Sequence, residues 1–277
     1  MRWGNTISDF FHVSNGVRQG GIMSPTLFNV YMDDLSKRLN NSGIGCSFNG
    51  VLYNHLMYAD DTCILAPSPC SLYKLLGLCS DFAIENTILF NSSKSKYMCI
   101  KPKSLSKLHV PNMYLNGELL KCVSKTKYLG VFIDNPVTDD EDIMRHVKAI
   151  YARGNVMVNR FKKCSEDVKV HLFQSYLSSV YGSQLWTTFK PSVFKKAVVA
   201  YNNICRKLFD IGRRDSMSAF YVSNNLDSFT ALYRKSIGNF RDRLMNCDNT
   251  LVTNIVSSVY FTFNSSHAYI WQRVLFT

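Results

Sequence analysis

The fold of this 277-residue chain is indicated most strongly by the stretch Val51-Leu52-Tyr53-Asn54-His55-Leu56-Met57-Tyr58-Ala59-Asp60-Asp61-Thr62-Cys63-Ile64-Leu65-Ala66-Pro67. Apolar, β-branched and aromatic residues on both sides of Asp60-Asp61 predict a β-hairpin with two carboxylates at its tip. Adjacent acidic side chains repel each other and disfavour a strand, so a fold keeps them at a strand junction mainly where a cation binds. A divalent metal that holds nucleotide phosphates is the candidate, and a solvated polar turn is the alternative that this stretch alone leaves open.

A second Tyr-x-Asp-Asp run, Tyr31-Met32-Asp33-Asp34, is expected on a helix instead. The apolar residues around it recur at three- and four-residue spacing, which is the pattern of a helical stripe: Leu27, Phe28, Tyr31, Leu35 and Leu39. Ser24-Pro25 marks the helix start, with Ser24 as the N-cap and Pro25 as the first helical residue. Asp33 and Asp34 lie off the stripe, so we expect them to be solvated and assign them no chemistry.

The composition is that of a packed globular protein that binds a polyanion. Hydrophobic residues make up 46% of the chain and aromatic residues 13%. Lys and Arg number 32 against 20 Asp and Glu, a net charge of +12, which favours nucleic acid first and an anionic membrane second. The nine cysteines contain no Cys-x-x-Cys pair, so we expect reduced, buried thiols and no zinc site. Without a signal peptide or a membrane span, an intracellular soluble protein is expected, in the nucleus or the cytoplasm.

The periodicity predicts an α+β fold whose second half is mainly helical, with a boundary near residue 136 that separates residues 1–135 from 136–277. The expected elements of the first part are an extended stretch near 10–13, a helix over 25–40, the carboxylate hairpin, a helix over 71–86, a strand at 97–100, a hairpin over 113–123 with Asn116-Gly117 at its tip, and a strand at 128–133. The second part begins with a capping box, Thr138-x-x-Glu141, and continues through helices opened by Ser165-Glu166 and over 191–208 and 227–245. The acidic run 139–142 is expected to complement the helix dipole.

Four sequence blocks, in the same order, resemble conserved blocks of the reverse transcriptase family. Their sequences are most similar to those of the non-LTR (LINE-type) retrotransposon enzymes. The first, Gly16-Val17-Arg18-Gln19-Gly20-Gly21-Ile22-Met23-Ser24-Pro25-Thr26-Leu27-Phe28, precedes the Tyr58-Ala59-Asp60-Asp61 hairpin. Asn91-Ser92-Ser93-Lys94-Ser95-Lys96 and Lys125-Thr126-Lys127-Tyr128-Leu129-Gly130-Val131 follow it. The resemblance spans essentially the whole chain and implies a partial palm at 1–135 followed by a basic helical thumb at 136–277.

The resemblance implies RNA-directed DNA polymerisation with two Mg²⁺ ions, an RNA template, a DNA primer and deoxynucleotide triphosphates as partners, and no membrane. Asp60 is the expected main metal ligand and Asp61 the secondary one, because carboxylate oxygens suit Mg²⁺. Lys94 is expected near the leaving pyrophosphate, and a solvated turn lysine is the alternative. The remaining expected contacts are to substrate and template: Arg18, Gln19, Gly20, Gly21, Ser24, Tyr58, Tyr128 and Gly130. The alternative for Gly20-Gly21 is an ordinary turn, and the alternative for Tyr128 is packing within a strand.

The helical part supplies a basic surface. Between Lys190 and Arg243 there are eleven Lys or Arg against four Asp or Glu, interleaved with aromatic residues most of which are expected in the core.

One block of the family is missing. The family's aromatic-x-x-Asp strand, which carries the other metal carboxylate, has no match before residue 16. We therefore expect a truncated copy with little or no polymerase activity alone, and a non-catalytic nucleic-acid-binding remnant is the alternative.

Overall fold

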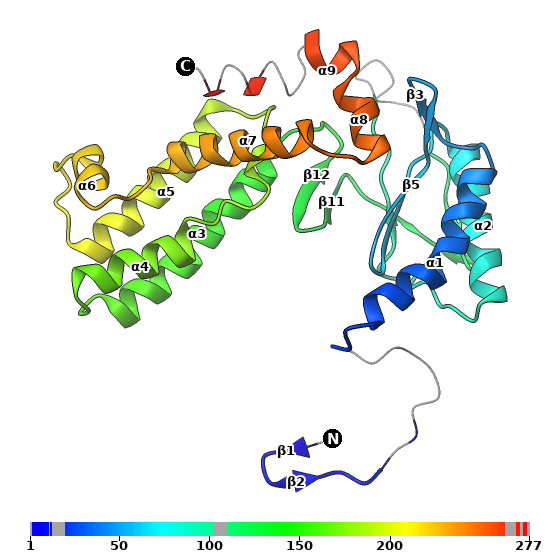
Figure 1. Ribbon diagram of the computed structural model, residues 1–277, viewed down its shortest axis with the longest axis horizontal. Helices are drawn as coiled ribbons and strands as arrows, with labels where there is room; N and C mark the ends of the chain where they lie inside the picture. Colours follow the sequence, from blue (N-terminus) through cyan, green and yellow to red (C-terminus); the bar gives the residue numbers. More distant parts are fainter. Residues whose placement is uncertain are drawn as a thin grey trace. The chain divides into compact units, whose positions relative to one another are not determined.

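The computed structural model describes residues 2–10, 12, 20–101, 110–263, 270, 271, 274 and 275 (Figure 1). Helices and short, mostly antiparallel strand pairs mix along the chain, which agrees with the expected α+β class. The chain divides into two compact units. Unit 1 comprises Met1–Phe90 with Tyr114–Glu118, and unit 2 comprises Asn91–Met113 with Leu119–Thr277. The proposed boundary at residue 136 therefore lies within unit 2.

Unit 1 consists of two long helices and three small hairpins. Its elements are β1 (Arg2–Trp3), β2 (Thr6–Ile7), α1 (Ser24–Asn41), β3 (Cys46–Phe48), β4 (Val51–Tyr53), β5 (His55–Tyr58), β6 (Asp61–Ile64), α2 (Pro69–Glu85) and β8 (Tyr114–Leu115). The strands pair antiparallel as β1 with β2, β3 with β4 and β5 with β6. Leu35 and Leu39 of α1 and Leu75 and Phe82 of α2 are fully buried, so the two helices share the core of this unit.

Helix α1 confirms the assignment of Tyr31-Met32-Asp33-Asp34 to a helix and corrects its details. Asp33 and Asp34 are exposed and form ion pairs with Lys37 at 2.7 Å and Arg38 at 2.9 Å. Ser24 is not the N-cap. The cap position is Met23, no side chain of the described residues caps the helix, and Pro25 occupies its second position. The stripe is also shifted, because Met32 is buried.

In unit 2, short strands precede a bundle of helices. The elements are β7 (Lys96–Tyr97), β10 (Lys121–Cys122), β11 (Lys125–Tyr128), β12 (Val131–Asp134), α3 (Asp140–Phe161), α4 (Glu166–Leu177), the short 3₁₀ helix η2 (Ser183–Leu185), α5 (Pro191–Phe209), α6 (Met217–Ser223), α7 (Phe229–Met245), α8 (Thr250–Val256) and α9 (Val259–Phe263), while β9 (Glu118–Leu119) straddles the division. Helix α3 packs along α5. Gly154 permits this approach, since a Cβ there would lie 2.5 Å from the Cγ2 of Ile204. The core includes Phe173, Trp186 and Tyr201, all fully buried.

Several predicted elements are confirmed. Helices α2, α4, α5 and α7 lie within a few residues of their expected ranges. Asn116 and Gly117 have φ of 52° and 78° and form the tip between β8 and β9, as the Asn-Gly signal predicts. Of the extended stretch near 10–13, only Phe10 and His12 are described, and neither belongs to a strand.

Three local predictions are wrong. The apolar run 128–133 is not one strand, because the chain turns at Leu129-Gly130 and β11 pairs antiparallel with β12. The strand at 97–100 shrinks to Lys96–Tyr97, which pairs parallel with β10. The capping box is absent: Asp139 is the N-cap of α3, and Thr138 bonds backward to Asp134 through its backbone N at 2.7 Å and its hydroxyl at 2.8 Å.

The cysteines are all free, and their burial varies more than expected. Cys79 and Cys205 are buried, and burial raises the pKa of each thiol to about 12. Cys70 and Cys122 are exposed, and the other five are partly buried. Within the part of the chain that the structure describes, no helix is long and apolar enough to cross a membrane.

Candidate polymerase site

The two carboxylates Asp60 and Asp61 project from the tip of the β5–β6 hairpin. Tyr58 pairs with Asp61 across the strands, so Ala59 and Asp60 form a two-residue turn. Ala59 has φ of 51°, a conformation that a residue with a Cβ adopts at a cost of about 1–2 kcal/mol. Both carboxylates are exposed, and Tyr58 is 67% exposed. The turn thus holds two adjacent carboxylates at the end of an antiparallel strand pair.

The base of this hairpin is fixed to α1 by Asn54 and His55. The Asn54 side chain is 1% exposed and donates to the Leu39 carbonyl at 2.6 Å. The two ring nitrogens of His55 lie 2.7 Å from Asn54 Oδ1 and 2.7 Å from the Ser36 hydroxyl. Burial lowers the pKa of His55, which favours the neutral ring at pH 7. These contacts attach the base of the hairpin to α1.

The oxygens of Asp60 and Asp61 are suitable ligands for a divalent cation, but two carboxylates are too few ligands for a complete site. Their oxygens are the hard ligands that Mg²⁺ prefers, and a hairpin tip presents them together. No cationic side chain in the described residues pairs with either carboxylate, in contrast to Asp33 and Asp34. However, the described residues contain no group of three or more His, Cys, Asp or Glu that could hold a metal ion. The tip therefore supplies part of a donor set.

The turn before α1 carries the described part of the Gln-Gly block. Gly20 has φ of 81°, and among the described residues no atom lies within 4 Å of where its Cβ would be, so on that side its backbone is open to close approach. The Ser24 backbone N donates to the Gly21 carbonyl at 3.2 Å, which closes the turn. Arg18 and Gln19 lie outside the described residues.

The other expected site residues belong to unit 2. Lys94 is exposed at the end of a turn, where its backbone N donates to Asn91 Oδ1 at 3.0 Å. Tyr128 is the last residue of β11, and Gly130 follows in the turn with φ of 85°. A Cβ on Gly130 would lie 3.0 Å from Tyr181 Cε1. Gly130 thus has a packing role that the sequence did not indicate.

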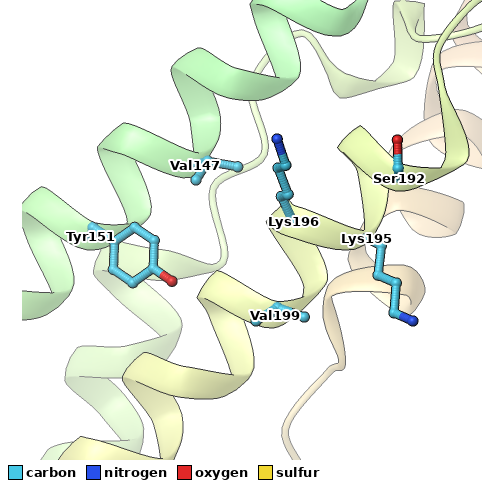
Figure 2. A pocket seen from close by; sticks show the side chains of 6 residues that line it. All are labelled: Val147, Tyr151, Ser192, Lys195, Lys196 and Val199. Atoms are coloured by element: carbon cyan, nitrogen blue, oxygen red, sulfur yellow. The ribbon is translucent and has the colours of Figure 1, made fainter.

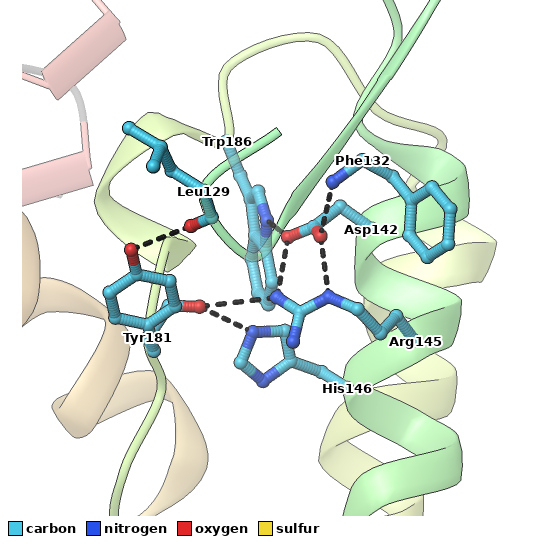
Figure 3. Close-up of polar contacts among 7 residues, drawn as sticks. All are labelled: Leu129, Phe132, Asp142, Arg145, His146, Tyr181 and Trp186. Atoms are coloured by element: carbon cyan, nitrogen blue, oxygen red, sulfur yellow. Dashed lines mark hydrogen bonds and ion pairs between the residues drawn. The ribbon is translucent and has the colours of Figure 1, made fainter. Parts of the chain in front are cut away.

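A buried polar network around Asp142 was not predicted (Figure 3). Asp142 is 1% exposed and accepts from the Phe132 backbone N at 3.0 Å and Trp186 Nε1 at 2.9 Å. Arg145 donates to the same carboxylate through Nε at 2.7 Å and Nη2 at 3.2 Å. Burial alone would raise the pKa of Asp142, but the bonds from Arg145, Phe132 and Trp186 outweigh it, and the pKa is lowered. The carboxylate is therefore ionised at pH 7.

This network attaches the β11–β12 hairpin to the helical bundle. Tyr181 donates its hydroxyl proton to the Leu129 carbonyl at 2.8 Å, and its own carbonyl lies 2.7 Å from His146 Nε2 (Figure 3). Burial and the nearby Arg145 lower the pKa of His146 to about 4, so the ring is neutral and donates to that carbonyl. The hairpin turn with Gly130 is thus held by α3 and by the Tyr181 segment. The i, i+3 spacing of Asp142 and Arg145 was the one sequence signal for it.

The basic charge of the chain belongs entirely to unit 2. By sequence, unit 1 has 5 Lys and Arg against 8 Asp and Glu, and unit 2 has 27 against 12. The net charges are therefore −3 and +15. This partition places the surface suited to a polyanion on the unit that contains the helical bundle.

The residues that match a known family include the hairpin and its flanking blocks. Residues 2–133 match the family model described as reverse transcriptase (RNA-dependent DNA polymerase). The chain is 26% identical over 220 residues to the probable RNA-directed DNA polymerase from transposon X-element of Drosophila melanogaster, covering 74% of this chain and 23% of the relative. It is 26% identical over 191 residues to the RNA-directed DNA polymerase from mobile element jockey of Drosophila funebris, covering 61% and 20%.

A third relative is the retrovirus-related Pol polyprotein from type-2 retrotransposable element R2DM of Drosophila melanogaster, 31% identical over 130 residues that cover 45% of this chain and 12% of the relative. The chain spans about a quarter or less of the length of these three relatives. Residues 2–133 of this chain belong to the reverse transcriptase family, and its relatives are the reverse transcriptases of non-LTR retrotransposons.

Proposed function

We propose that this chain carries the palm region of a non-LTR retrotransposon reverse transcriptase in residues 1–135 and a basic, helical thumb in residues 136–277. Its reaction class is RNA-templated DNA synthesis from deoxynucleotide triphosphates by nucleotidyl transfer. The observation that carries the proposal is the exposed pair Asp60 and Asp61 inside the region that matches the family, with Asp60 in the two-residue hairpin turn and Asp61 at the start of β6.

In this proposal Asp60 and Asp61 hold the divalent metal, and Gly20 and Gly21 let the backbone approach a base pair or a phosphate. Bound Mg²⁺ supplies Lewis-acid activation and charge neutralisation for an in-line displacement. Lys94 offers a positive charge or a proton to the leaving pyrophosphate. Tyr128 and Gly130 lie on a hairpin of unit 2 and are assigned to primer contact, and Tyr58, Ser24, Arg18 and Gln19 to substrate or template contact.

The described donor set is incomplete, so we propose that the 277-residue chain alone polymerises weakly or not at all. Two adjacent carboxylates without an opposing one bind a metal pair weakly, because affinity depends on ligand number and geometry. The two-metal mechanism therefore requires a further carboxylate beside Asp60 and Asp61.

Primer extension on an RNA template with Mg²⁺ tests both the metal site at Asp60 and Asp61 and the proposed low activity of the chain alone. The variants are Asp60→Asn/Asp61→Asn and the matched pair Asp33→Asn/Asp34→Asn, which removes the same charge from a helix with no assigned chemistry. We expect at most trace product, lost in the first variant and kept in the second. Efficient extension that survives Asp60→Asn/Asp61→Asn would refute the site, and efficient extension that the variant abolishes would refute the proposed incompleteness.

A second candidate function is nucleic-acid binding without catalysis. The +15 net charge of unit 2 favours it, since phosphate neutralisation alone gives binding that does not depend on sequence. Filter binding of an RNA–DNA duplex at low salt tests this candidate, and absence of binding would exclude it.

A further inference from the structure

Basic side chains lie near both ends of helix α5. Near its start, Lys195 and Lys196 line an open groove of about 440 Å³ against α3 (Figure 2). At its end, Arg206 and Lys207 lead into the connection 210–216, which carries two more arginines. The groove belongs to the basic charge of unit 2 described above. The connection differs from it, because there the arginines precede an exposed hydroxyl.

The stretch Arg213-Arg214-Asp215-Ser216-Met217 has a spacing that is rare in this chain. Among all its serines and threonines, only Ser165 and Ser216 have basic residues at both the second and the third preceding positions. Ser165 follows Lys162-Lys163 and precedes two acidic residues, and Lys162 is paired with Asp210 at 2.7 Å. Ser216 follows two arginines and precedes an apolar residue, so it has the more positive surroundings.

A tight turn presents the two arginines to solvent. The Asp215 backbone N donates to the Gly212 carbonyl at 3.2 Å, and the Gly212 backbone N donates to Asp215 Oδ2 at 2.8 Å. Arg206 of α5 holds the turn by donating to the Gly212 carbonyl and, at 2.8 Å, to the Asp215 carbonyl. Arg213 and Arg214 are the central residues of this turn, and both are exposed. Within the described part of the chain neither forms an ion pair, so both guanidinium groups can bind an external carboxylate.

The Ser216 hydroxyl lies next to this turn at the start of α6. It is exposed, and its Oγ accepts a long hydrogen bond of 3.3 Å from the Ala219 backbone N. Helix α6 has seven residues, with Tyr221 buried and Met217 partly buried against the helical core. A helix this short gains little from its own hydrogen bonds, so its first turn opens at low cost. The segment can therefore become extended within the cleft of an enzyme.

We propose that Ser216 is phosphorylated by an arginine-directed serine protein kinase. The inference does not depend on the proposed polymerase site. Arg213 and Arg214 pair with carboxylates of the kinase cleft, because a guanidinium binds a carboxylate through two parallel hydrogen bonds and such charge patterns select kinase substrates.

The phosphoryl donor is ATP. Ser216 Oγ forms a bond to the γ-phosphorus, while the bond between that phosphorus and the oxygen that bridges to the β-phosphate breaks. A carboxylate of the kinase accepts the hydroxyl proton, and ADP leaves with the bonding electron pair.

The modification removes the positive charge of this connection. Residues 206–216 contain four Lys or Arg against two Asp, a net charge of +2. A phosphoserine carries about −1.5 to −2 at pH 7, so the net charge of the stretch falls to about zero. The phosphate therefore acts as a charge switch at the C-terminal end of α5.

Phosphorylation of the 277-residue chain by the catalytic subunit of cyclic-AMP-dependent protein kinase, with ATP and Mg²⁺, tests the proposal. Initial rates are measured with radiolabelled ATP, and tandem mass spectrometry locates the phosphate. Ser216→Asn removes the hydroxyl but keeps a side-chain oxygen that caps a helix equally well, so a loss of labelling does not report an unfolded α6. Ser165→Ala is the matched control at the other serine that follows two basic residues.

The unsubstituted chain should take up phosphate at Ser216. Ser216→Asn should abolish this labelling, and Ser165→Ala should preserve it. Arg213→Gln/Arg214→Gln keeps the hydroxyl and should lower kcat/KM about a hundredfold, about tenfold for each lost charge-assisted contact. Lys162→Gln/Lys163→Gln removes the same charge before Ser165 and should leave the rate unchanged.

Labelling at Ser165 in place of Ser216, or equal rates for the two double variants, would overturn the proposal. A synthetic peptide of residues 210–220 presents the same sequence without the fold. Labelling of this peptide while the folded chain stays unlabelled would show that the structure withholds Ser216, and would also overturn the proposal. A failure of the proposed polymerase site is separate, because Asp60→Asn/Asp61→Asn should leave the labelling unchanged.

Discussion

Replacing Asp142 by Ala should destabilise unit 2 by about 3–5 kcal/mol, which is the usual cost of breaking a buried ion pair by removing one partner. The carboxylate is 1% exposed, and the Arg145 side chain is 22% exposed. Without Asp142 the guanidinium loses its acidic partner and keeps only the Tyr181 carbonyl, at 3.3 Å from Nη2, while the Phe132 N–H and the Trp186 indole N–H become unsatisfied. A buried unsatisfied donor alone costs about 1–3 kcal/mol. Asp142→Asn keeps an acceptor of similar shape and should cost less.

Urea unfolding followed by tryptophan fluorescence measures this loss, because the fully buried Trp186 is itself a member of the network. Glu141→Ala is the matched control. Glu141 is the preceding residue, but its ion pair with Lys125 joins side chains that are 51% and 52% exposed, and such pairs contribute about 0–1 kcal/mol. A cost for Asp142→Ala as small as that for Glu141→Ala would refute the reasoning from burial.

Three other changes test separate parts of the structure. The pKa of His146 is lowered from 6.5 to about 4, so the folded state binds fewer protons than the unfolded state between these values. Stability should fall as the pH drops through this window, by up to about 1.4 kcal/mol per unit, and His146→Gln should flatten the urea-midpoint profile there. Gly154→Ala would place a Cβ 2.5 Å from Ile204 and should cost about 1–3 kcal/mol in the same assay, with partial recovery in a double variant with Ile204→Ala. Ala59→Gly should raise the melting temperature by removing a positive φ from a residue with a Cβ, whereas Ala152→Gly, on an exposed helical position, should lower it.

Local patterns were sufficient where one short-range interaction dominates the structure. The carboxylate hairpin, the Asn116-Gly117 tip and the helical assignment of Asp33 and Asp34 all follow from spacing and turn chemistry, whereas the exact turn residues Ala59 and Asp60 come from the structure. The position of Asp60 and Asp61 at a tip is therefore a property of the sequence around them.

The errors arose where distant residues determine the local conformation. The turn at Leu129-Gly130 is stabilised by Tyr181, 52 positions along the chain, so an apolar run of strand-forming residues did not reveal it. The acidic run before α3 suggested only a helix dipole effect. In the structure Asp142 binds the Trp186 indole, 44 positions away, and Asp139 accepts from the backbone N of Thr187 at 2.7 Å.

The central claim is that Asp60 and Asp61 form a divalent-metal site, and paramagnetic line broadening by Mn²⁺ tests it most directly because it detects weak binding. In backbone NMR spectra of the chain, Mn²⁺ should broaden the amide signals of residues 58–62 first. Asp60→Asn/Asp61→Asn should abolish this broadening, and Asp33→Asn/Asp34→Asn should preserve it. Equal broadening at both acidic pairs, or broadening at 58–62 that survives Asp60→Asn/Asp61→Asn, would contradict the account.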